Sequence, residues 1–326
     1  MPKPRKAYIN LSETSYYHCI SRCVRRAFLC GQDKLTGQCY EHRRQWVEER
    51  MLFLAEHFAI DICAFAVMSN HIHLVLCVES ELCESWTENE VIHKWHQVYK
   101  GSPATQKYLD GDDLTPPELY AVSQYAELYR ARLKDISWFM RSLNEPIARQ
   151  ANAEDKCTGR FWEGRFKSQP LLDEAAILSC MAYVDLNPVR AKIAKNLEDS
   201  DHTSIQLRIK AAMQGKQPQQ LKPFHGHVNE DISNAMTFNL KDYLELVDAT
   251  GRVIRADKKG ALPAQETKLL TKLNISAKQW VEMTQNFESV FKGAVGQIEH
   301  LTSFYQKQNY KKRVGVSASK HYLAAG

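Results

Sequence analysis

The chain has 326 residues, of which 44% are hydrophobic and 25% charged, a composition typical of a globular protein with one large domain or two ordinary ones. No apolar run approaches the roughly 18 residues that a membrane helix needs, and no apolar segment follows the basic N-terminus, which argues against a membrane span and a secretory signal. We therefore expect a cytoplasmic protein whose nine cysteines, none of them in a CxxC pair, stay reduced.

Positive charge is concentrated at both ends of the chain, although the net charge is only +5. Residues 1–30 contain six lysines or arginines and one acid, and residues 301–326 contain five and no acid. Two basic ends on a nearly neutral body favour a polyanionic partner, with nucleic acid first. Basic tails that only aid solubility are the alternative, and charge by itself does not decide between them.

The first third of the chain predicts a short strand, a helix and a hairpin. Residues 16–23 have strand character and lead into basic residues, while residues 36–58 have apolar side chains at helical spacing behind Thr36, a suitable N-cap. Two apolar runs, 60–68 and 71–78, flank the turn formers Ser69 and Asn70, which indicates two buried strands joined by a tight turn.

The middle of the chain is more polar and mostly helical. We expect a loop rich in glycine, aspartate and proline at 101–117, inside an insertion of about 84–130, and a helix at 133–152. An aromatic and basic loop follows at 159–173. The next helix begins at residue 174 and is expected to break or kink at Pro188.

The residues after about 200 have weaker patterns. We expect a short structured module at 241–260, a helical stretch at 264–293 and a flexible basic tail at 306–326. Strand, helix, two strands and then helices is an α+β pattern, with a small antiparallel sheet covered by helices. The domain prediction is therefore a first domain at 1–205 and a partly helical C-terminal extension at 206–326.

The stretch AVMSNHIHLVL places two histidines one residue apart in the second strand of the hairpin. Because strand side chains alternate, His71 and His73 share one face, and Ile72, Leu74 and Leu76 form the apolar face that must meet the core. Two adjacent imidazoles suit half of a divalent metal site or a general-base pair. Two solvent-facing histidines on a hairpin are the alternative, which the motif alone favours.

The helix that begins at residue 174 supplies two further candidates, Tyr183 and Asn187. They are four residues apart and so share a helix face. A phenol can attack phosphorus once a metal polarises the phosphate, and an amide oxygen can complete a metal shell. A packed tyrosine and an asparagine that caps the helix ahead of Pro188 are the alternative for either residue alone.

Three motifs in order, AVMSNHIHLVL, GRFWEGRFKS and MAYVDLNPVRAKI, resemble the HUH single-tyrosine transposases, and among them the REP-associated tyrosine transposases that are related to insertion-sequence transposases. The resemblance covers roughly residues 7–205. His71 and His73 match the family's two-histidine motif, Tyr183 its nucleophile, and Asn187 its polar metal ligand. The stretch DHTSIQLR lacks the tryptophan that many relatives carry there, and both the 101–117 segment and the C-terminal extension exceed the minimal family.

The resemblance implies a ferredoxin-like βαββαβ core with the histidines on a central strand. It implies that Mg²⁺ or Mn²⁺ on His71, His73 and Asn187 polarises a DNA phosphate, that Tyr183 attacks it, and that a 5′-phosphotyrosine and a free 3′-OH result. DNA, single-stranded or in a hairpin, is the expected partner; relatives differ in acting as dimers or monomers, so a homodimer stays open. Two other hypotheses are a DNA-binding regulator that has lost strand cleavage and a histidine metalloenzyme acting on a small molecule.

Basic residues near the first strand and in the aromatic loop are candidates for DNA contacts. Arginine and lysine bind backbone phosphates, and neighbouring aromatic rings stack on unpaired bases. Solvated loop charge is the alternative for the arginines, and anchoring of the loop on the core is the interpretation we favour for Trp162 and Phe166. The candidates are Arg22, Arg25, Arg26, Arg160, Arg165 and Lys167.

Overall fold

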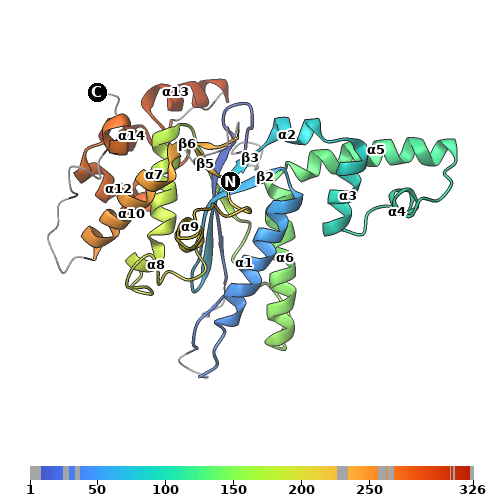
Figure 1. Cartoon of the computed structure of the whole chain (residues 1–326), viewed down its shortest axis with the longest axis horizontal. Coiled ribbons are helices and arrows are strands. Elements are labelled where there is room, and N and C mark those ends of the chain that lie inside the picture. Colours follow the sequence, from blue (N-terminus) through green and yellow to red (C-terminus); the bar gives the residue numbers. More distant parts are fainter. Residues whose placement is uncertain are drawn as a thin grey trace.

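The computed structural model describes residues 9–24, 29–33, 37–225, 234–255, 262, 268–308, 310 and 313–323. Its centre is a four-stranded sheet in which every neighbouring pair is antiparallel and the strand order is β2-β3-β1-β4. The strands are β1 (Tyr16–Arg22), β2 (Ile60–Val67), β3 (His71–Val78) and β4 (Lys167–Leu171). Helices lie on both faces of this sheet (Figure 1), so the expected α+β class is confirmed.

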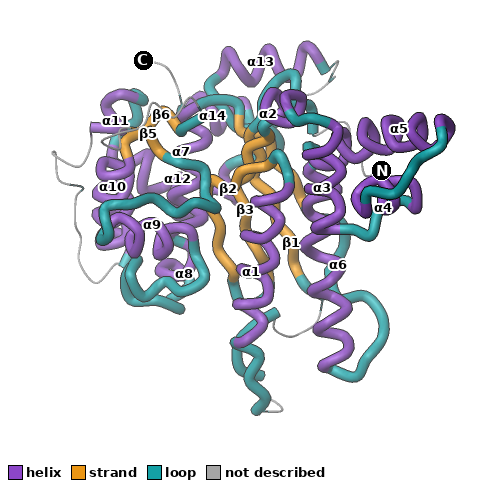
Figure 2. The backbone as a smooth tube through the Cα atoms, turned by 45° about the vertical axis from the view of Figure 1, so that its right-hand side comes forward, coloured by secondary structure: helices purple, strands orange, loops and turns teal. Residues whose placement is uncertain are grey.

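Side-chain alternation on β3 separates two hydrophobic layers. Ile72, Leu74 and Leu76 point to the layer formed with α1 (His42–His57) and α6 (Ile136–Glu154), which lie next to each other on one face (Figure 2). The opposite side chains of β3 point to α7 (Glu174–Asp185), which packs on β2 and β3. The histidine face of β3 is therefore not open to solvent, because a second core covers it.

The ends of α7 follow directly from the local sequence. Asp173 is the N-cap, and its carboxylate accepts a hydrogen bond of 2.9 Å from the backbone N–H of Ala176. The helix ends at Asp185, and a short helix, α8 (Asn187–Arg190), continues with Pro188 in its first turn, where a missing N–H is tolerated. The predicted break at Pro188 is confirmed.

The proline inside α6 is stabilised by a neighbouring helix. Pro146 cannot donate to the carbonyl of Ser142. Nε of Arg50 on α1 donates to that carbonyl oxygen at 3.1 Å, which replaces the missing bond and ties the two helices together.

The segment between β3 and α6 is helical rather than a loop. The expected loop at 101–117 is wrong, because Ser102 and Thr105 form a capping box that starts α4, and Gly111 ends it with φ 77°. The helices between β3 and α6 form an arm that projects from the sheet (Figure 1). Its helices are α2 (Ser80–Ser85), α3 (Glu88–Val98), α4 (Pro103–Asp110) and α5 (Pro116–Leu133).

Two other boundaries differ from the sequence expectations. The first long helix begins at His42 after Glu41, and Thr36, the predicted N-cap, lies outside the described residues. The predicted flexible tail at 306–326 is wrong in part, because α14 (Val316–Tyr322) forms there and Leu323 is buried against the core.

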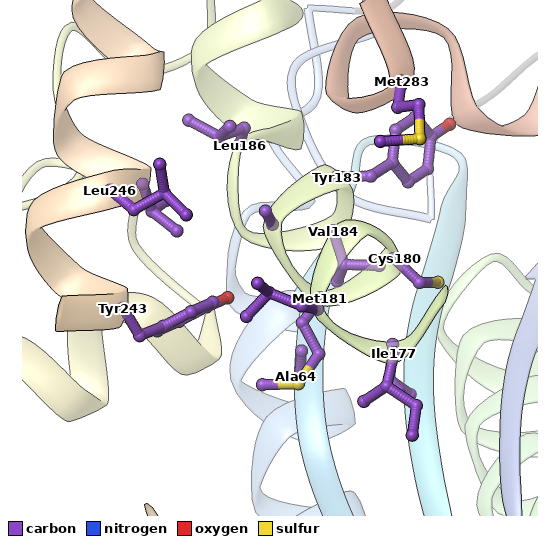
Figure 3. Close-up of a cluster of buried hydrophobic side chains, with 14 of the residues drawn as sticks. Ala64, Ile177, Cys180, Met181, Tyr183, Val184, Leu186, Tyr243, Leu246 and Met283 are labelled. Carbon is purple, nitrogen blue, oxygen red and sulfur yellow. The ribbon is translucent and has the colours of Figure 1, made fainter. Parts of the chain in front are cut away.

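Residues beyond position 205 pack directly on α7. Tyr243, Trp280 and Phe287 belong to the same hydrophobic cluster as Met181 and Tyr183. Figure 3 shows Tyr243 facing α7. The C-terminal extension therefore shares a core with the first domain. Its elements are α9 (Ser204–Ala212), β5 (Phe224–His225), β6 (Met236–Asn239), α10 (Leu240–Ile254), α11 (Lys268–Lys272), α12 (Ala277–Val290) and α13 (Ile298–Lys307).

No helix among the described residues is both long and apolar enough to span a bilayer.

Candidate functional site

Three histidines meet on the face of the sheet that α7 covers. His71 and His73 lie on β3, and His18 lies on the neighbouring strand β1, where His73 pairs with Ile20. His18 and His73 are buried, with 1% and 0% of their surface exposed, and His71 is half-buried at the end of the strand. The structure thus brings together the two predicted histidines and adds His18, which the sequence analysis did not single out.

Each histidine of β3 has its Nδ1 engaged by a neighbour. Nδ1 of His71 lies 2.5 Å from Oδ1 of Asn70, and Nδ1 of His73 lies 3.0 Å from Nε2 of His18. Since an amide oxygen only accepts, Nδ1 of His71 carries the proton and its Nε2 keeps a free lone pair. Nε2 of His73 is buried and has no hydrogen-bond partner.

Burial keeps all three imidazoles neutral at pH 7. It lowers the pKa of His18 to about 4, against the raising effects of the Glu288 carboxylate and of Gln169. Burial also lowers the pKa of His71 to about 4, and the charge of Arg22 lowers it further. The pKa of His73 is lowered well below its ordinary value by burial and by its histidine neighbours. Neutral imidazoles are the form that binds metal ions.

Tyr183 lies at this cluster, as predicted. The centre of its ring is 5.7 Å from that of His73 and 6.2 Å from that of His18. Its side chain is buried between them and Phe287 of α12, with 6% of the residue exposed. The hydroxyl donates a hydrogen bond of 2.7 Å to Oε1 of Glu288.

Glu288 is the second residue that the sequence analysis missed. Its Oε1 lies 2.7 Å from the hydroxyl of Tyr183 and 3.6 Å from Nε2 of His73. It follows Phe287 on α12, far along the chain from the matched motifs, and no spacing in the sequence connects it to them. His18 did carry a signal, because a polar ring alternates with apolar residues in the first predicted strand.

Arg190 stands over the ring of Tyr183. Its guanidinium carbon lies 4.0 Å from the ring centre, and the group donates to Oδ1 of Asn187 and to the backbone oxygen of Gln285. Burial raises the pKa of Tyr183, Glu288 raises it further, and the charge and hydrogen bonding of Arg190 act in the opposite direction. A positive charge therefore faces the phenol of Tyr183 at the histidine cluster.

The structure places Asn187 one turn after Tyr183, in α8, with 5% of its surface exposed. Its Oδ1 accepts a hydrogen bond from Arg190, and its Nδ2 is buried without a hydrogen-bond partner. A carbonyl oxygen has two lone pairs, so Oδ1 has one left for a metal ion while it holds Arg190.

Donor chemistry at the site fits two nitrogen ligands for a divalent ion. Metal-binding histidines commonly have their second ring nitrogen held by a neighbour, as Nδ1 of His71 and His73 is here. Nε2 of His73 has no hydrogen-bond partner and can bind a metal ion when Nδ1 carries the proton. Within the described part of the chain, however, no three His, Cys, Asp or Glu side chains converge on a shared metal position. A full ligand set therefore needs an amide oxygen, water or substrate oxygens.

The predicted basic residues lie at the edge of the sheet next to the aromatic loop. Cys23 forms an isolated bridge with Trp162, and the backbone N–H of Glu163 donates to the oxygen of Arg22 at 2.8 Å, which brings the loop beside β1. The four described candidates are exposed, and Arg25 and Arg26 lie outside the described residues. The exposed residues are Arg22, Arg160, Arg165 and Lys167.

A groove of about 660 Å³ runs between this loop and α6. Trp138, Arg141, Trp162 and Arg165 are among its lining residues. Nε1 of Trp162 donates to the backbone oxygen of Asn144 at 2.8 Å, so Trp162 anchors the loop on α6 as expected. Phe166 is also buried, in agreement with its predicted anchoring role.

Comparison with known proteins adds little to this geometry. No protein-family model and no curated protein matches the sequence. A solved structure of a REP-associated tyrosine transposase bound to a REP hairpin aligns with 73% of this chain and 100% of that chain, with 12% sequence identity and a TM-score of 0.38. A likeness at this level carries no argument about function, so any function has to be inferred from the residues of the site.

Proposed function

We propose that this protein is a metal-dependent DNA strand transferase of the HUH single-tyrosine type, which cleaves and rejoins single-stranded or hairpin DNA through Tyr183. The observation that carries the proposal is the position of the Tyr183 hydroxyl. Residues matched by two separated motifs, HIH and AYVDLNP, meet in space, with the rings of Tyr183 and His73 5.7 Å apart. Strand cleavage needs the tyrosine next to the metal-binding histidines, and two motifs that are distant in the sequence do not by themselves guarantee this.

The core would then be ferredoxin-like, as the resemblance implies. The chain runs β1, α1, β2, β3, helices including α6, and β4, and the sheet order is β2-β3-β1-β4 with antiparallel neighbours. This arrangement supports the βαββαβ assignment and places the histidines on a central strand. α7, which carries Tyr183, follows the last strand of that unit and covers the opposite face from α1 and α6.

His71, His73 and the second lone pair of the Asn187 amide oxygen would hold Mg²⁺ or Mn²⁺. Bound there, the ion would supply Lewis-acid polarisation of the phosphate that is to be cleaved. The surrounding protein prepares these ligands, since burial keeps the imidazoles neutral and Asn70 and His18 hold their Nδ1 atoms.

Tyr183 would attack the phosphorus atom of a DNA phosphodiester. Its hydroxyl gives up its proton to solvent as Oη forms the new bond to phosphorus. The bond from phosphorus to the 3′ oxygen breaks, and the 3′ oxygen takes up a proton from solvent to leave as a free hydroxyl. Arg190 stabilises the negative charge that develops beside the ring. The resulting 5′-phosphotyrosine conserves the energy of the diester, so the reverse step can join strands without a nucleotide cofactor.

DNA would reach the site along the basic edge of the sheet. The exposed Arg22, Arg165 and Lys167 supply phosphate contacts, and the groove that contains Trp138 and Trp162 offers apolar faces for unpaired bases. We place the activity in the cytoplasm, and the proposal is compatible with a monomer or a homodimer.

The test is covalent capture of DNA. The full-length protein is incubated with Mn²⁺ and a labelled oligonucleotide hairpin copied from the DNA that flanks its own gene, and denaturing gels separate protein–DNA adducts. The wild type is expected to form an adduct and Tyr183→Phe none, with both proteins binding the oligonucleotide. An adduct of undiminished yield with Tyr183→Phe would show that another residue is the nucleophile.

One observation favours a second function, that of a DNA-binding regulator without strand cleavage. Tyr183 is only 6% exposed and its hydroxyl is bound to Glu288, so the closed site does not present a free nucleophile. The same gel separates the two functions, because a regulator would bind the hairpin and leave no denaturant-resistant band at any Mn²⁺ concentration.

A further inference from the structure

The carboxylate of Glu288 occupies a position with the properties of a phosphate subsite. One of its oxygens accepts from the nucleophilic hydroxyl of Tyr183 and lies 3.6 Å from Nε2 of His73. The scissile phosphate has to approach the same two groups. It must lie next to the hydroxyl of Tyr183 that attacks it and next to the metal ion that His73 would hold. An anionic oxygen of the protein itself therefore stands where the reaction requires an anionic oxygen of DNA.

The charges around this position also suit an incoming anion. Arg190 lies over the ring of Tyr183, and both Arg190 and Arg22 act electrostatically on His71 together with Glu288. Lys292 adds a third cationic side chain nearby, because its Nζ donates to the backbone oxygen of Glu288 at 2.7 Å. Glu288 offsets them until a phosphate takes its place.

We infer that Glu288 is an internal phosphate mimic that closes the strand-transfer site, and that DNA opens the site by displacing this carboxylate from Tyr183. The inference rests on the proposed function, since it takes Tyr183 as the nucleophile. The other residues of the site precede position 205. Access to that site would thus be controlled by the C-terminal extension, through Glu288.

Opening requires little rearrangement of the core. The side chain of Glu288 is 32% exposed, so it can rotate toward solvent. Phe287, the preceding residue, is fully buried and its ring packs at 6.1 Å from His18 and 5.6 Å from Tyr183. The gate is therefore a single side chain at the rim of the site, while the helix that carries it remains in the hydrophobic cluster.

The experiment compares Glu288→Gln and Glu288→Ala with the wild type in the full-length protein. Glutamine removes the charge and keeps the size, and alanine also removes the hydrogen bond to Tyr183. Glu299→Gln on α13 is the matched control, because it is exposed and loses the same charge on the same extension. Thermal unfolding of each variant verifies that the fold is retained.

Two readouts are used with the labelled hairpin oligonucleotide. In EDTA, fluorescence anisotropy measures binding without cleavage; with Mn²⁺, denaturing gels measure the rate of adduct formation. Relative to Glu299→Gln, we expect Glu288→Ala to bind about tenfold more tightly and to form the adduct about tenfold faster, the change that losing one charged hydrogen bond gives. Glu288→Gln should show a smaller gain in the same direction.

The outcomes separate this inference from the proposed function. Slower adduct formation by Glu288→Ala would overturn the inference and show that Glu288 assists the reaction. The same affinity and the same adduct rate in Glu288→Ala and Glu299→Gln would also overturn it. If no protein forms an adduct, the strand-transfer function fails. Tighter binding of Glu288→Ala in EDTA would then still support a carboxylate that competes with DNA phosphate.

Discussion

Nε2 of His18 lies 3.0 Å from Nδ1 of His73, across two neighbouring strands of the sheet, and both rings are buried. One nitrogen must donate and the other accept, so this contact couples the tautomer of His73 to that of His18. When Nδ1 of His73 is the donor, its Nε2 presents a lone pair to the site. His18 is therefore placed to act on a metal ion through His73 without touching it.

The first prediction concerns this contact. His18→Phe keeps a ring of similar size and removes the hydrogen-bond partner of Nδ1 of His73, so the tautomer of His73 is no longer coupled to His18. Loss of such an outer partner typically lowers metal affinity by about 10- to 100-fold. We expect that loss for Mn²⁺, measured by electron paramagnetic resonance of free Mn²⁺ or by titration calorimetry in the absence of DNA.

His93→Phe is the control for this variant, because His93 is an exposed histidine on α3. It should leave Mn²⁺ affinity unchanged. If His18→Phe binds Mn²⁺ as tightly as the control does, the contact between the two strands has no part in metal binding.

The second prediction separates the roles of Asn187 and Arg190, which share a hydrogen bond. Asn187→Ala removes the proposed oxygen ligand and also frees the guanidinium, so it should weaken Mn²⁺ binding and slow adduct formation. Arg190→Gln removes the charge over Tyr183 and the guanidinium hydrogen bonds to Asn187 and Gln285, but it keeps the proposed metal ligands. It should therefore slow adduct formation by about 100-fold, as for loss of one transition-state charge contact, and change Mn²⁺ affinity less than Asn187→Ala does.

Calorimetry with Mn²⁺ and the covalent-capture gel measure the two effects on the same samples. Unchanged Mn²⁺ affinity in Asn187→Ala would remove Asn187 from the metal shell and leave it as the residue that positions Arg190. Asn196→Ala, which changes an asparagine outside the site, controls for a general loss of stability.

The sequence predicted the sheet face of the histidines and the helix of the tyrosine for clear physical reasons. Alternation along β3 forces His71 and His73 opposite Ile72 and Leu74, and Pro188 ends the helix after Tyr183. These features depend on neighbours in the chain. The hairpin of β2 and β3 depends in the same way on Ser69 and Asn70, between two apolar runs.

Features that depend on distant segments were not accessible. Glu288 reaches Tyr183 only because α12 packs on α7, and the aromatic side chains of α12 that produce this packing have the same spacing as those of any amphipathic helix. The sequence likewise contained no sign that α12 covers the histidine face together with α7. The helix α4 was missed because Pro103 stands in its first turn and Gly111 ends it, and proline and glycine form loops elsewhere.

The third prediction concerns acid stability. The pKa of His18 is about 4 in the folded protein against an ordinary 6.5, so the unfolded chain binds a proton between these values and the folded chain does not. The stability that depends on neutral His18 is therefore fully present above pH 6.5, and it is lost as the pH falls toward 4. For His18 the loss is on the order of 3 kcal/mol, and His71 and His73, whose pKa values burial also lowers, add losses in the same direction.

Urea unfolding between pH 7.5 and 4.5 measures this dependence. In His18→Phe the decline should be shallower, because the contribution of His18 is missing. Asp185 acts in the opposite direction, since burial raises its pKa to about 6 and its ionised form destabilises the fold as the pH rises. Its effect is common to wild type and variant, so the difference between their slopes isolates His18. An identical slope in the two proteins would contradict neutral burial of His18.

The last prediction concerns the basic edge of the sheet. Arg22 is held next to the aromatic loop by the hydrogen bond from Glu163, and Arg165 and Lys167 follow on that loop and on β4. All three are exposed, so their charges are available to the backbone of a single strand. Replacing each by glutamine should weaken binding of an oligonucleotide in EDTA, and the loss should be similar for different base sequences.

The dependence on salt identifies these contacts as contacts with phosphate. Each neutralised phosphate of a single strand contributes about 0.7 to the slope of log affinity against log salt concentration, so each effective variant should reduce the slope by roughly that amount. Lys216→Gln, an exposed lysine after α9, should leave both affinity and slope unchanged. A variant that weakens binding with an unchanged slope would point to a contact with bases, and a triple variant that binds like the wild type would place the DNA on another face of the protein.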